Sequence, residues 1–359
     1  MKGAILLEYG EPLVIERIDA FELGPKDVRM QVEASGVCHS DWWAMSGLYP
    51  LELPVIMGHE GAGVVLEVGA HVTRVKPGDR IVAALYAACG QCWHCVRDET
   101  NLCDHHPVVH HVKHSQRAQG DGRLEGLNGL GTFADEMVID ESMAVKVETD
   151  LPGEQLALLG CGVTTGVGAA LNTARVKPGS TVAVVGCGGV GQSVIQGAAI
   201  AGAARIVAVD PTPLKRDVAT AFGATDLVDP GDGDPVEQVR ELTGGRGVDY
   251  AFEVVGRPQT MMQAYEMARR GGTAVMVGAA RNEDVISFNA FELHHEKTIK
   301  GCTYGSAQVH RDLQMLVDLA EQGRLDLAAM VTRTFALEQI NEAFDAMHAG
   351  TVVRGVVVP

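Results

Sequence analysis

Short apolar runs separated by glycine and proline characterise the chain up to about residue 155. Two runs, 28–32 and 63–68, have the length and composition of strands, and a turn at 75–80 leads into a third run at 81–85. Runs of this length between turn-forming residues predict β-strands, and no sustained helical period accompanies them. We expect a β-rich region with one long loop over 104–130, rich in histidine and glycine. Loops this long are usually functional or mobile.

From about residue 160 the pattern changes, because strand-like runs now alternate with helical stretches. Strands are expected at 181–185, 205–209, 250–254 and 274–277, and helices at 190–201 and 214–222. This alternation is typical of βαβ units that build a parallel sheet. After about residue 300 we expect helices at 312–321 and 337–347, and strands at 331–335 and 355–358.

These changes of pattern predict the domain organisation of an α/β protein. We expect 1–160 to form a β-rich domain and 161–300 to form a doubly wound parallel sheet. The last part, 301–359, is expected to return to the first domain and complete it. A chain of this length is long enough for two domains.

The composition narrows the range of partners. The 359 residues are 46% hydrophobic and carry a formal net charge of -17, so we expect no binding to nucleic acid or to anionic membranes. The first apolar run ends at Glu8, too soon for a signal peptide, and no stretch approaches the roughly 20 apolar residues of a membrane span. We therefore expect a cytoplasmic protein whose eight cysteines bind metal or take part in catalysis instead of forming disulfides.

A glycine-rich turn lies between the expected strand at 181–185 and the helix that follows. It has the spacing G-x-G-x-x-G, formed by Gly186, Gly188 and Gly191 with Gly189 and Val190 between them. Such glycines allow a tight turn, a close approach to a pyrophosphate and close helix–strand packing. Asp210 ends the next expected strand, where it can bind ribose hydroxyls and repel a 2′-phosphate, which favours NAD over NADP. The alternatives are a turn that binds nothing and a site for another nucleotide.

Four cysteines with the spacing C-x2-C-x2-C-x7-C form a second motif. They are Cys89, Cys92, Cys95 and Cys103. Four thiolates this close together can complete the tetrahedral shell of a structural zinc ion. Iron–sulfur clusters also use closely spaced cysteines, but here no proline follows the last cysteine and the run lies in the β-rich region.

Three further features are separated in the sequence: Cys38 close to Ser40 and Asp41, His59-Glu60 between two glycines, and Cys161 at the change of pattern. Together with the glycine-rich turn and the four cysteines, they resemble the zinc-dependent medium-chain alcohol dehydrogenase family along nearly the whole chain. The resemblance implies a GroES-like catalytic domain, a Rossmann NAD-binding domain and an active site in the cleft between them. It also implies NAD and two zinc ions per chain.

By that resemblance Cys38, His59 and Cys161 are the ligands of a catalytic zinc, with a fourth position left open for water or substrate oxygen. Glu60 matches a residue that binds the zinc transiently, and Asp41 matches the partner that orients His59.

The segment 160–166 and the long loop after Cys103 resemble the classical and class III branch, which includes the glutathione-dependent formaldehyde dehydrogenases. In that branch Ser40 would receive the substrate proton. The cofactor contacts implied by the resemblance are His39 and Arg354 to the pyrophosphate, Lys215 to the adenosine ribose, and Val277. Trp43 replaces the relay histidine of some relatives, so the last proton acceptor would be water or another base.

These features predict reversible hydride transfer between an alcohol and NAD, giving an aldehyde or ketone. We expect a primary, apolar or aromatic alcohol, and Trp42, Trp43, Tyr49 and Leu85 either line its pocket or belong to the core. One alternative is a thiol-dependent S-hydroxymethyl (formaldehyde) dehydrogenase, whose glutathione or mycothiol carrier would meet Lys113, Arg117 and Arg123. Another is a non-catalytic, zinc-stabilised NAD-binding protein.

Two further expectations concern assembly and the histidine-rich segment. We expect a homo-oligomer, either a dimer or a tetramer. We also expect that the histidine-rich segment at 105–114 is not a stable metal site.

Overall fold

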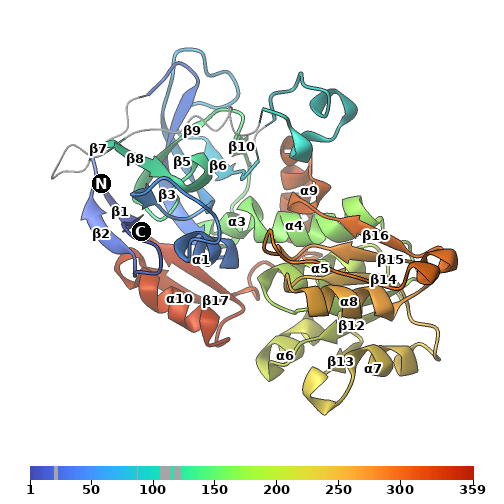
Figure 1. The fold of residues 1–359 in the computed structure, drawn as a ribbon. Coiled ribbons are helices and arrows are strands. Elements are labelled where there is room, and N and C mark those ends of the chain that lie inside the picture. The colour runs from blue at the N-terminus through green and yellow to red at the C-terminus, as the bar shows by residue number, and fades with distance from the viewer. Residues whose placement is uncertain (20–22, 87, 106–114, 117–122) are drawn as a thin grey trace. The chain divides into compact units, whose positions relative to one another are not determined.

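The chain divides into two units, each with its own sheets and core (Figure 1). The computed structural model describes all residues except 20–22, 87, 106–114 and 117–122. Unit 1 contains Met1–Gly162, Gln308–Gly323 and Leu327–Pro359. Unit 2 contains Val163–Ala307 and Arg324–Asp326.

Unit 1 is built on two sheets. The first has the order β2-β1-β4-β8-β7. Its strands are β1 (Lys2–Leu6), β2 (Val14–Arg17), β4 (Val55–Ile56), β7 (Ser115–Gln116) and β8 (Arg123–Gly126). The second has the order β10-β6-β5-β3-β18-β17, with β9 also paired to β3. Its strands are β3 (Asp27–Gly36), β5 (Glu60–Val68), β6 (Arg80–Ala83), β9 (Glu136–Asp140), β10 (Ala144–Lys146), β17 (Val331–Ala336) and β18 (Arg354–Val358).

The second sheet brings distant parts of the sequence together at the end of β3. Gly36 pairs with Glu60 of β5 on one side and with Val356 of β18 on the other, and both pairings are antiparallel. This register places the start of β5 and the start of β18 on either side of the residues that follow Gly36. The C-terminal strand therefore belongs to the same sheet as the N-terminal strands.

Buried side chains on strand faces form the core of unit 1. Val28, Met30 and Val32 of β3 alternate with more exposed positions and pack with Ile81 of β6 and Ile139 of β9. Period-two alternation of this kind gives a strand one buried face. The helices of unit 1 are α1 (His39–Met45), α3 (Gly153–Ala157), α9 (Val309–Glu321) and α10 (Ile340–His348).

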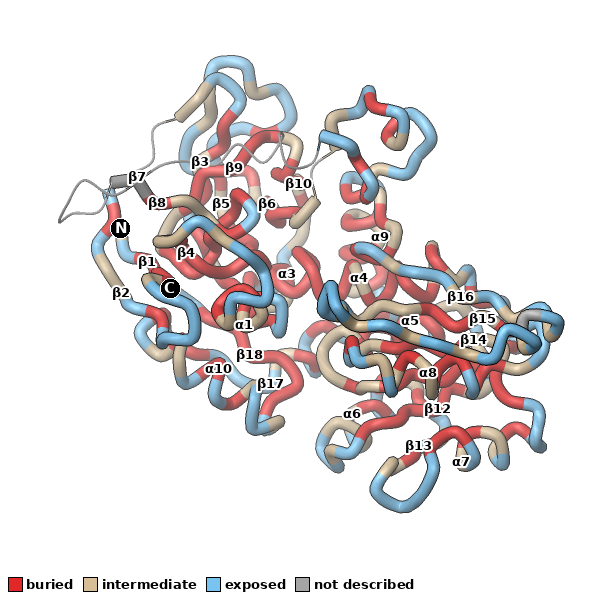
Figure 2. The backbone as a smooth tube through the Cα atoms, viewed as in Figure 1, coloured by how far each residue is buried: buried red, intermediate tan, exposed pale blue. Residues whose placement is uncertain are grey.

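Unit 2 is a six-stranded parallel sheet with the order β13-β12-β11-β14-β15-β16. Its strands are β11 (Thr181–Val185), β12 (Arg205–Val209), β13 (Asp226–Val228), β14 (Val248–Glu253), β15 (Ala268–Met276) and β16 (Thr298–Gly301). Its helices are α4 (Gly162–Gly168), which begins at the last residue of unit 1, α5 (Gly189–Ile200), α6 (Pro213–Ala221), α7 (Pro235–Leu242) and α8 (Pro258–Met267). The central strands β11 and β12 are buried along almost their whole length, as Figure 2 shows for β12. The order reverses between β11 and β14, which is where doubly wound sheets bind their ligands.

The predicted class, a β-rich GroES-like domain with a Rossmann sheet, is confirmed, but two local predictions are wrong. Helices α1 and α3 interrupt the N-terminal region, and with seven and five residues they are too short to produce a visible helical period. The segment 104–130 is not one loop, because its described part contains β7, β8 and a 3-10 turn at Leu127–Gly129. Strands of two to four residues likewise leave little trace in a sequence.

Among the described residues, no single helix has the length and apolar composition of a membrane span. One bent pair of helices in the described part of the chain, Gly153–Gly160 and Gly162–Ala174, meets those two criteria together.

Candidate metal and cofactor sites

The first candidate metal site lies in unit 1, and all of its residues are buried. The ligand atoms of Cys38, His59, Glu60 and Cys161 all lie within 4.8 Å of one another. Cys38 lies between β3 and α1. His59 directly precedes β5, which Glu60 begins, and Cys161 follows a 3-10 turn at Leu158–Gly160. The pairing of β3 with β5 therefore brings three of these side chains together.

His59 is oriented as a metal ligand would be. Its Nδ1 lies 2.7 Å from Oδ1 of Asp41, to which it donates, and its buried Nε2 has no hydrogen-bond partner. Burial lowers the pKa of His59, but the charges and hydrogen bonds of Asp41 and Cys38 together outweigh burial, so that the pKa is raised well above its usual value. A buried nitrogen without a partner is costly. Two sulfurs beside this nitrogen are a donor set that zinc prefers, so the residues fit the ion.

The two cysteines of this site differ in acidity. A hydrogen bond from Cys161 lowers the pKa of Cys38 well below its usual value, and His59 lowers it further. The same hydrogen bond and burial raise the pKa of Cys161. Cys38 therefore loses its proton more readily than Cys161, and both must be thiolates to bind a metal.

Glu60 is held by two partners next to the cysteines. Its Oε1 accepts a hydrogen bond from the backbone N–H of Gly162 at 3.0 Å, and its Oε2 pairs with the Arg354 guanidinium. Burial raises the pKa of Glu60 to about 7, although Arg354 opposes the shift. Arg354 is 3% exposed and its Nε has no partner. The predicted contact of Arg354 with a pyrophosphate stays a prediction.

Ser40 and His39, the first residues of α1, are both exposed. The Ser40 Oγ lies 3.8 Å from Sγ of Cys38. The ring of His39 stacks on His348 with centroids 6.2 Å apart. The structure thus brings Ser40 to the metal site that the sequence assigned it to, and leaves its hydroxyl open to solvent.

The predicted pocket residues divide into two kinds. Trp42 packs against the core of unit 1 and contacts His348, and Leu85 packs against the second sheet. Tyr49 is 55% exposed, and Trp43 is half-buried.

Tyr86 is a candidate that the sequence analysis missed. Burial raises its pKa, and the charges of Tyr49 and Cys161 raise it further, which places the phenol near both. The only signal in the sequence was an aromatic residue just after the strand at 81–85.

The second candidate metal site is the four-cysteine loop, also in unit 1. Sulfurs of Cys89 and Cys95 lie 3.9 Å apart, as do those of Cys92 and Cys103. Zinc–sulfur bonds of about 2.3 Å in a tetrahedron put sulfurs roughly 3.8 Å apart, so these distances fit a zinc ion. Backbone N–H groups of the same loop point at three of the sulfurs. The hydrogen bond from Cys95 lowers the pKa of Cys92 to about 6.

The glycine-rich turn of unit 2 has the local geometry that a dinucleotide needs. Gly186 has a φ of +93°, which other residues rarely adopt. A Cβ on Gly191 would lie 1.9 Å from the carbonyl oxygen of Gly186, so helix α5 packs tightly on the turn. A Cβ on Gly188 would meet nothing within 4 Å, so open space faces the N-terminus of α5. Helix N-termini of this kind bind pyrophosphate, so the turn fits the cofactor.

Asp210 directly follows β12 and is buried. Its two oxygens accept hydrogen bonds from the backbone N–H groups of Cys187 and Thr212, both at 2.8 Å. Lys215 lies in α6, and Val277 follows β15 with its N–H bonded to the Glu253 carbonyl. The carboxylate is thus fixed beside the glycine-rich turn, as the sequence predicted, while contacts of Lys215 and Val277 with a cofactor stay predictions.

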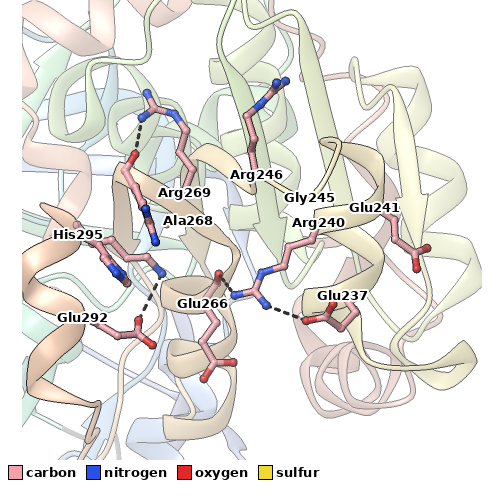
Figure 3. Close-up of a pocket in the computed structure, with 12 residues that line it drawn as sticks. Glu237, Arg240, Glu241, Gly245, Arg246, Glu266, Ala268, Arg269, Glu292 and His295 are labelled. Atoms are coloured by element: carbon pink, nitrogen blue, oxygen red, sulfur yellow. Dashed lines mark hydrogen bonds and ion pairs between the residues drawn. The ribbon is translucent and has the colours of Figure 1, made fainter.

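Unit 2 also has a charged surface depression of about 480 Å³. It includes Arg240, which is bonded to Glu237 and to the Glu266 carbonyl, and Arg269 (Figure 3). Cations and carboxylates are interspersed there, and none of the predicted site residues lines it. It therefore adds nothing to the chemistry of the sites above.

Most of the histidine-rich segment lies outside the described residues, as do two of the three cationic residues predicted to contact glutathione or mycothiol. These are 106–114, with Lys113, and 117–122, with Arg117. Arg123 begins β8.

Comparisons with known proteins match this arrangement. The family model of the alcohol dehydrogenase GroES-like domain matches residues 24–149, and that of zinc-binding dehydrogenases matches residues 189–322. The S-(hydroxymethyl)glutathione dehydrogenase of Escherichia coli O139:H28 is 40% identical over 368 residues, which cover 99% of both chains.

Solved structures agree over the whole length. Benzyl alcohol dehydrogenase from Acinetobacter calcoaceticus superposes with a TM-score of 0.92 at 28% identity, covering 99% of this chain and 98% of that one. A zinc-binding dehydrogenase from Sinorhizobium meliloti 1021 bound to NADP gives a TM-score of 0.83 at 29% identity, covering 100% and 99%. The predictions of the family, of NAD and of two zinc ions are confirmed. The chain belongs to the zinc-binding alcohol dehydrogenases, a family of oxidoreductases.

Proposed function

We propose that this chain oxidises primary alcohols, apolar or aromatic, with NAD, and reduces the corresponding aldehydes. The observation that carries the proposal is the buried set of Cys38, His59 and Cys161, in which the Nε2 of His59 has no partner within the protein. When bound, zinc supplies the Lewis acidity that lowers the pKa of an alcohol hydroxyl, and NAD supplies the hydride acceptor.

The residues of the site would bind the zinc ion and orient its ligands. Cys38, His59 and Cys161 would hold the ion, and Asp41 keeps the His59 ring in the required orientation through its 2.7 Å hydrogen bond. Glu60 lies within reach of the same ion, but its oxygens are engaged by Gly162 and Arg354. We assign Glu60 to transient ligation only.

Ser40 is the group that we assign to proton transfer. Its hydroxyl lies beside Cys38 and is exposed, so Oγ can accept a proton from a substrate hydroxyl and release one toward solvent. Trp43, at the position of the relay histidine in some relatives, cannot accept that proton. We propose that the proton leaves by way of the cofactor ribose and water. His39, Arg354, Lys215, Val277 and the glycine-rich turn are the proposed cofactor contacts.

An aromatic substrate is supported by Tyr86 and Tyr49. Tyr86 lies near both Tyr49 and Cys161 by their charge effects on its pKa, and aromatic rings pack well against one another. The structural relative named benzyl alcohol dehydrogenase agrees with such a substrate.

A panel of primary, secondary and aromatic alcohols with NAD tests the proposal. We expect the highest kcat/KM for a primary aromatic or apolar alcohol, and two zinc ions per chain. A purified chain that holds both zinc ions and binds NAD, yet turns over none of these alcohols, would be the non-catalytic protein considered above.

The second candidate is oxidation of an S-hydroxymethyl thiol adduct. It is favoured by the 40% identity with S-(hydroxymethyl)glutathione dehydrogenases over the whole chain. Formaldehyde assayed with and without glutathione or mycothiol separates the two candidates. Turnover that requires the thiol and exceeds that of the best simple alcohol would establish the second.

We further propose a cytoplasmic location and a division of the chain into domains at 1–160, 161–300 and 301–359.

We also propose that the chain forms a homo-oligomer. The edge strand β16 has no neighbour on its outer side in the described part of the chain. Val285 and Phe291, which precede β16 in the chain, are 77% and 67% exposed, and open strand edges and exposed apolar side chains favour association. Sedimentation of the wild type and of Phe291→Glu tests this. A monomeric wild type would contradict it.

A further inference from the structure

Arg216 is a cation held close to the residue that favours NAD. It lies in α6, and its Nη1 donates a hydrogen bond to the backbone carbonyl of Asp210 at 2.5 Å. Its guanidinium therefore lies at the carboxyl end of β12. This is the part of a Rossmann domain where an acidic residue binds the adenosine ribose and where an arginine accommodates a 2′-phosphate.

Asp229 occupies the other side of that guanidinium. Nη2 of Arg216 lies 2.8 Å from Oδ2 of Asp229, and the two side chains are only 14% and 24% exposed. The second oxygen of Asp229 accepts the backbone N–H of Gly231 at 2.8 Å. Asp229 is therefore fixed by its own turn, directly after β13, and cannot follow Arg216 to another position without breaking that bond.

The ion pair with Asp229 leaves Arg216 fewer hydrogen-bond donors for a phosphate. An arginine binds a 2′-phosphate most strongly through two parallel N–H···O bonds from an edge of its guanidinium that no other acceptor holds. Here one nitrogen bonds to a carbonyl and another to a carboxylate. Asp210 and Asp229 also place two negative charges around the single positive one. The same fold in a relative contains NADP, so exclusion of the phosphate depends on side chains and not on the fold.

We propose that Asp229 is a specificity-determining residue that restrains and neutralises Arg216, and so keeps the adenosine end selective for a ribose without a 2′-phosphate. Asp210 repels the phosphate directly, while Asp229 withholds the cation that would bind it. This inference rests on the proposed binding of NAD in unit 2. It assigns to the pair Arg216–Asp229 a role that neither residue shows in the sequence, since they lie thirteen positions apart on different elements.

The test is equilibrium binding of NAD, NADP, 5′-AMP and 2′,5′-ADP by calorimetry, with no turnover required. In Asp229→Asn the side-chain oxygen still caps the turn, but the charge is removed. We expect the ratio of Kd for NADP to Kd for NAD to fall by about tenfold, with the same trend for the two smaller nucleotides. Addition of Arg216→Ala to Asp229→Asn should restore the wild-type ratio, because the released cation is then gone.

Asp226→Asn is the matched control, since Asp226 on β13 pairs with Arg205 at the opposite end of β12. Its ratio should equal that of the wild type. Melting curves monitor folding, and Asp229→Ser, which also retains a capping oxygen, replaces the first variant if that one unfolds. A ratio that changes by less than about threefold, that stays low without Arg216, or that falls equally in Asp226→Asn overturns the inference. A wild type that binds neither NAD nor 5′-AMP would instead overturn the proposed function.

Discussion

The Oδ1 of Asp41 lies 2.7 Å from Nδ1 of His59, and both side chains are almost completely buried. The Oδ2 of the same carboxylate accepts the backbone N–H of Cys38 at 3.1 Å. One carboxylate therefore positions two of the proposed zinc ligands, His59 just before β5 and Cys38 just before α1.

Asp41→Asn should weaken the hold on the catalytic zinc. The amide can accept only one of the two hydrogen bonds and cannot fix the His59 tautomer as a carboxylate does. We expect affinity for this ion to fall by about 10–100-fold, as for other partners of metal-bound histidines. Zinc content after dialysis against a chelator measures the loss.

The four-cysteine site supplies the internal control for this variant. The total should fall from two ions per chain toward one, with the Cys89–Cys103 loop still loaded. Two ions retained under conditions that leave the wild type with two would show that Asp41 does not position His59.

The four-cysteine site itself should contribute to stability and not to chemistry. Cys103→Ser removes one corner of a site in which every sulfur is close to the others, so we expect one zinc ion fewer. Loss of a metal is among the changes that destabilise a protein most, and more than about 2 kcal/mol is expected. Denaturant unfolding of the variant measures it.

Cys302→Ser is the matched control, because Cys302 is a free cysteine outside both metal groups. Its effect should stay below about 1 kcal/mol. An equal loss of stability in both variants would mean that Cys103 acts as an ordinary buried side chain.

The sequence predicted those features of the sites that depend on spacing within a short segment. The glycines at 186–191 and the cysteines at 89–103 each lie within one short segment. Their spacing in the sequence is therefore enough to predict a binding site there. The helix α1 escaped prediction because its seven residues depend on Cys38 and Asp41 bonding to each other at its start.

Contacts between distant segments depend on strand register, which the sequence pattern does not contain. Arg354 and Glu60 are 294 positions apart and meet only because β18 and β5 both pair with the end of β3. The same holds for Tyr86 near Cys161 and for Arg216 with Asp229. A resemblance to a family could name Arg354, but it could not give the partner.

Gly188 and Gly191 should respond differently to alanine, although both belong to one motif. A Cβ on Gly191 would lie 1.9 Å from a backbone oxygen, and one on Gly188 would meet no atom within 4 Å. Gly191→Ala should therefore destabilise the protein by about 1–3 kcal/mol, as overpacking does. Gly188→Ala should fold normally and bind NAD at least about tenfold more weakly. Melting curves and NAD titration separate the two effects, and a destabilised Gly188→Ala would contradict this assignment.

Asp249 of unit 2 accepts hydrogen bonds from a threonine and an arginine. It accepts hydrogen bonds from the N–H and Oγ of Thr181 at 2.7 and 2.8 Å, and from Nε of Arg269 at 2.7 Å. Burial alone would raise the pKa of Asp249, but these donors outweigh it, so the pKa lies below its usual value of 3.8. The bonds join the starts of β11 and β14 to the start of β15.

The lowered pKa of Asp249 makes unit 2 less stable as the pH falls. The folded state binds the proton of Asp249 less tightly than the unfolded state, so its contribution is complete above the unfolded value of 3.8. It is lost as the pH falls through the lower folded pKa. Asp249→Asn should cost about 1–2 kcal/mol at neutral pH, and this cost should shrink as the pH falls below 3.8. Urea unfolding of the apoprotein across pH measures it, with Asp217→Asn on exposed α6 as the control. A cost that is the same at every pH would show that Asp249 acts by packing and not by charge.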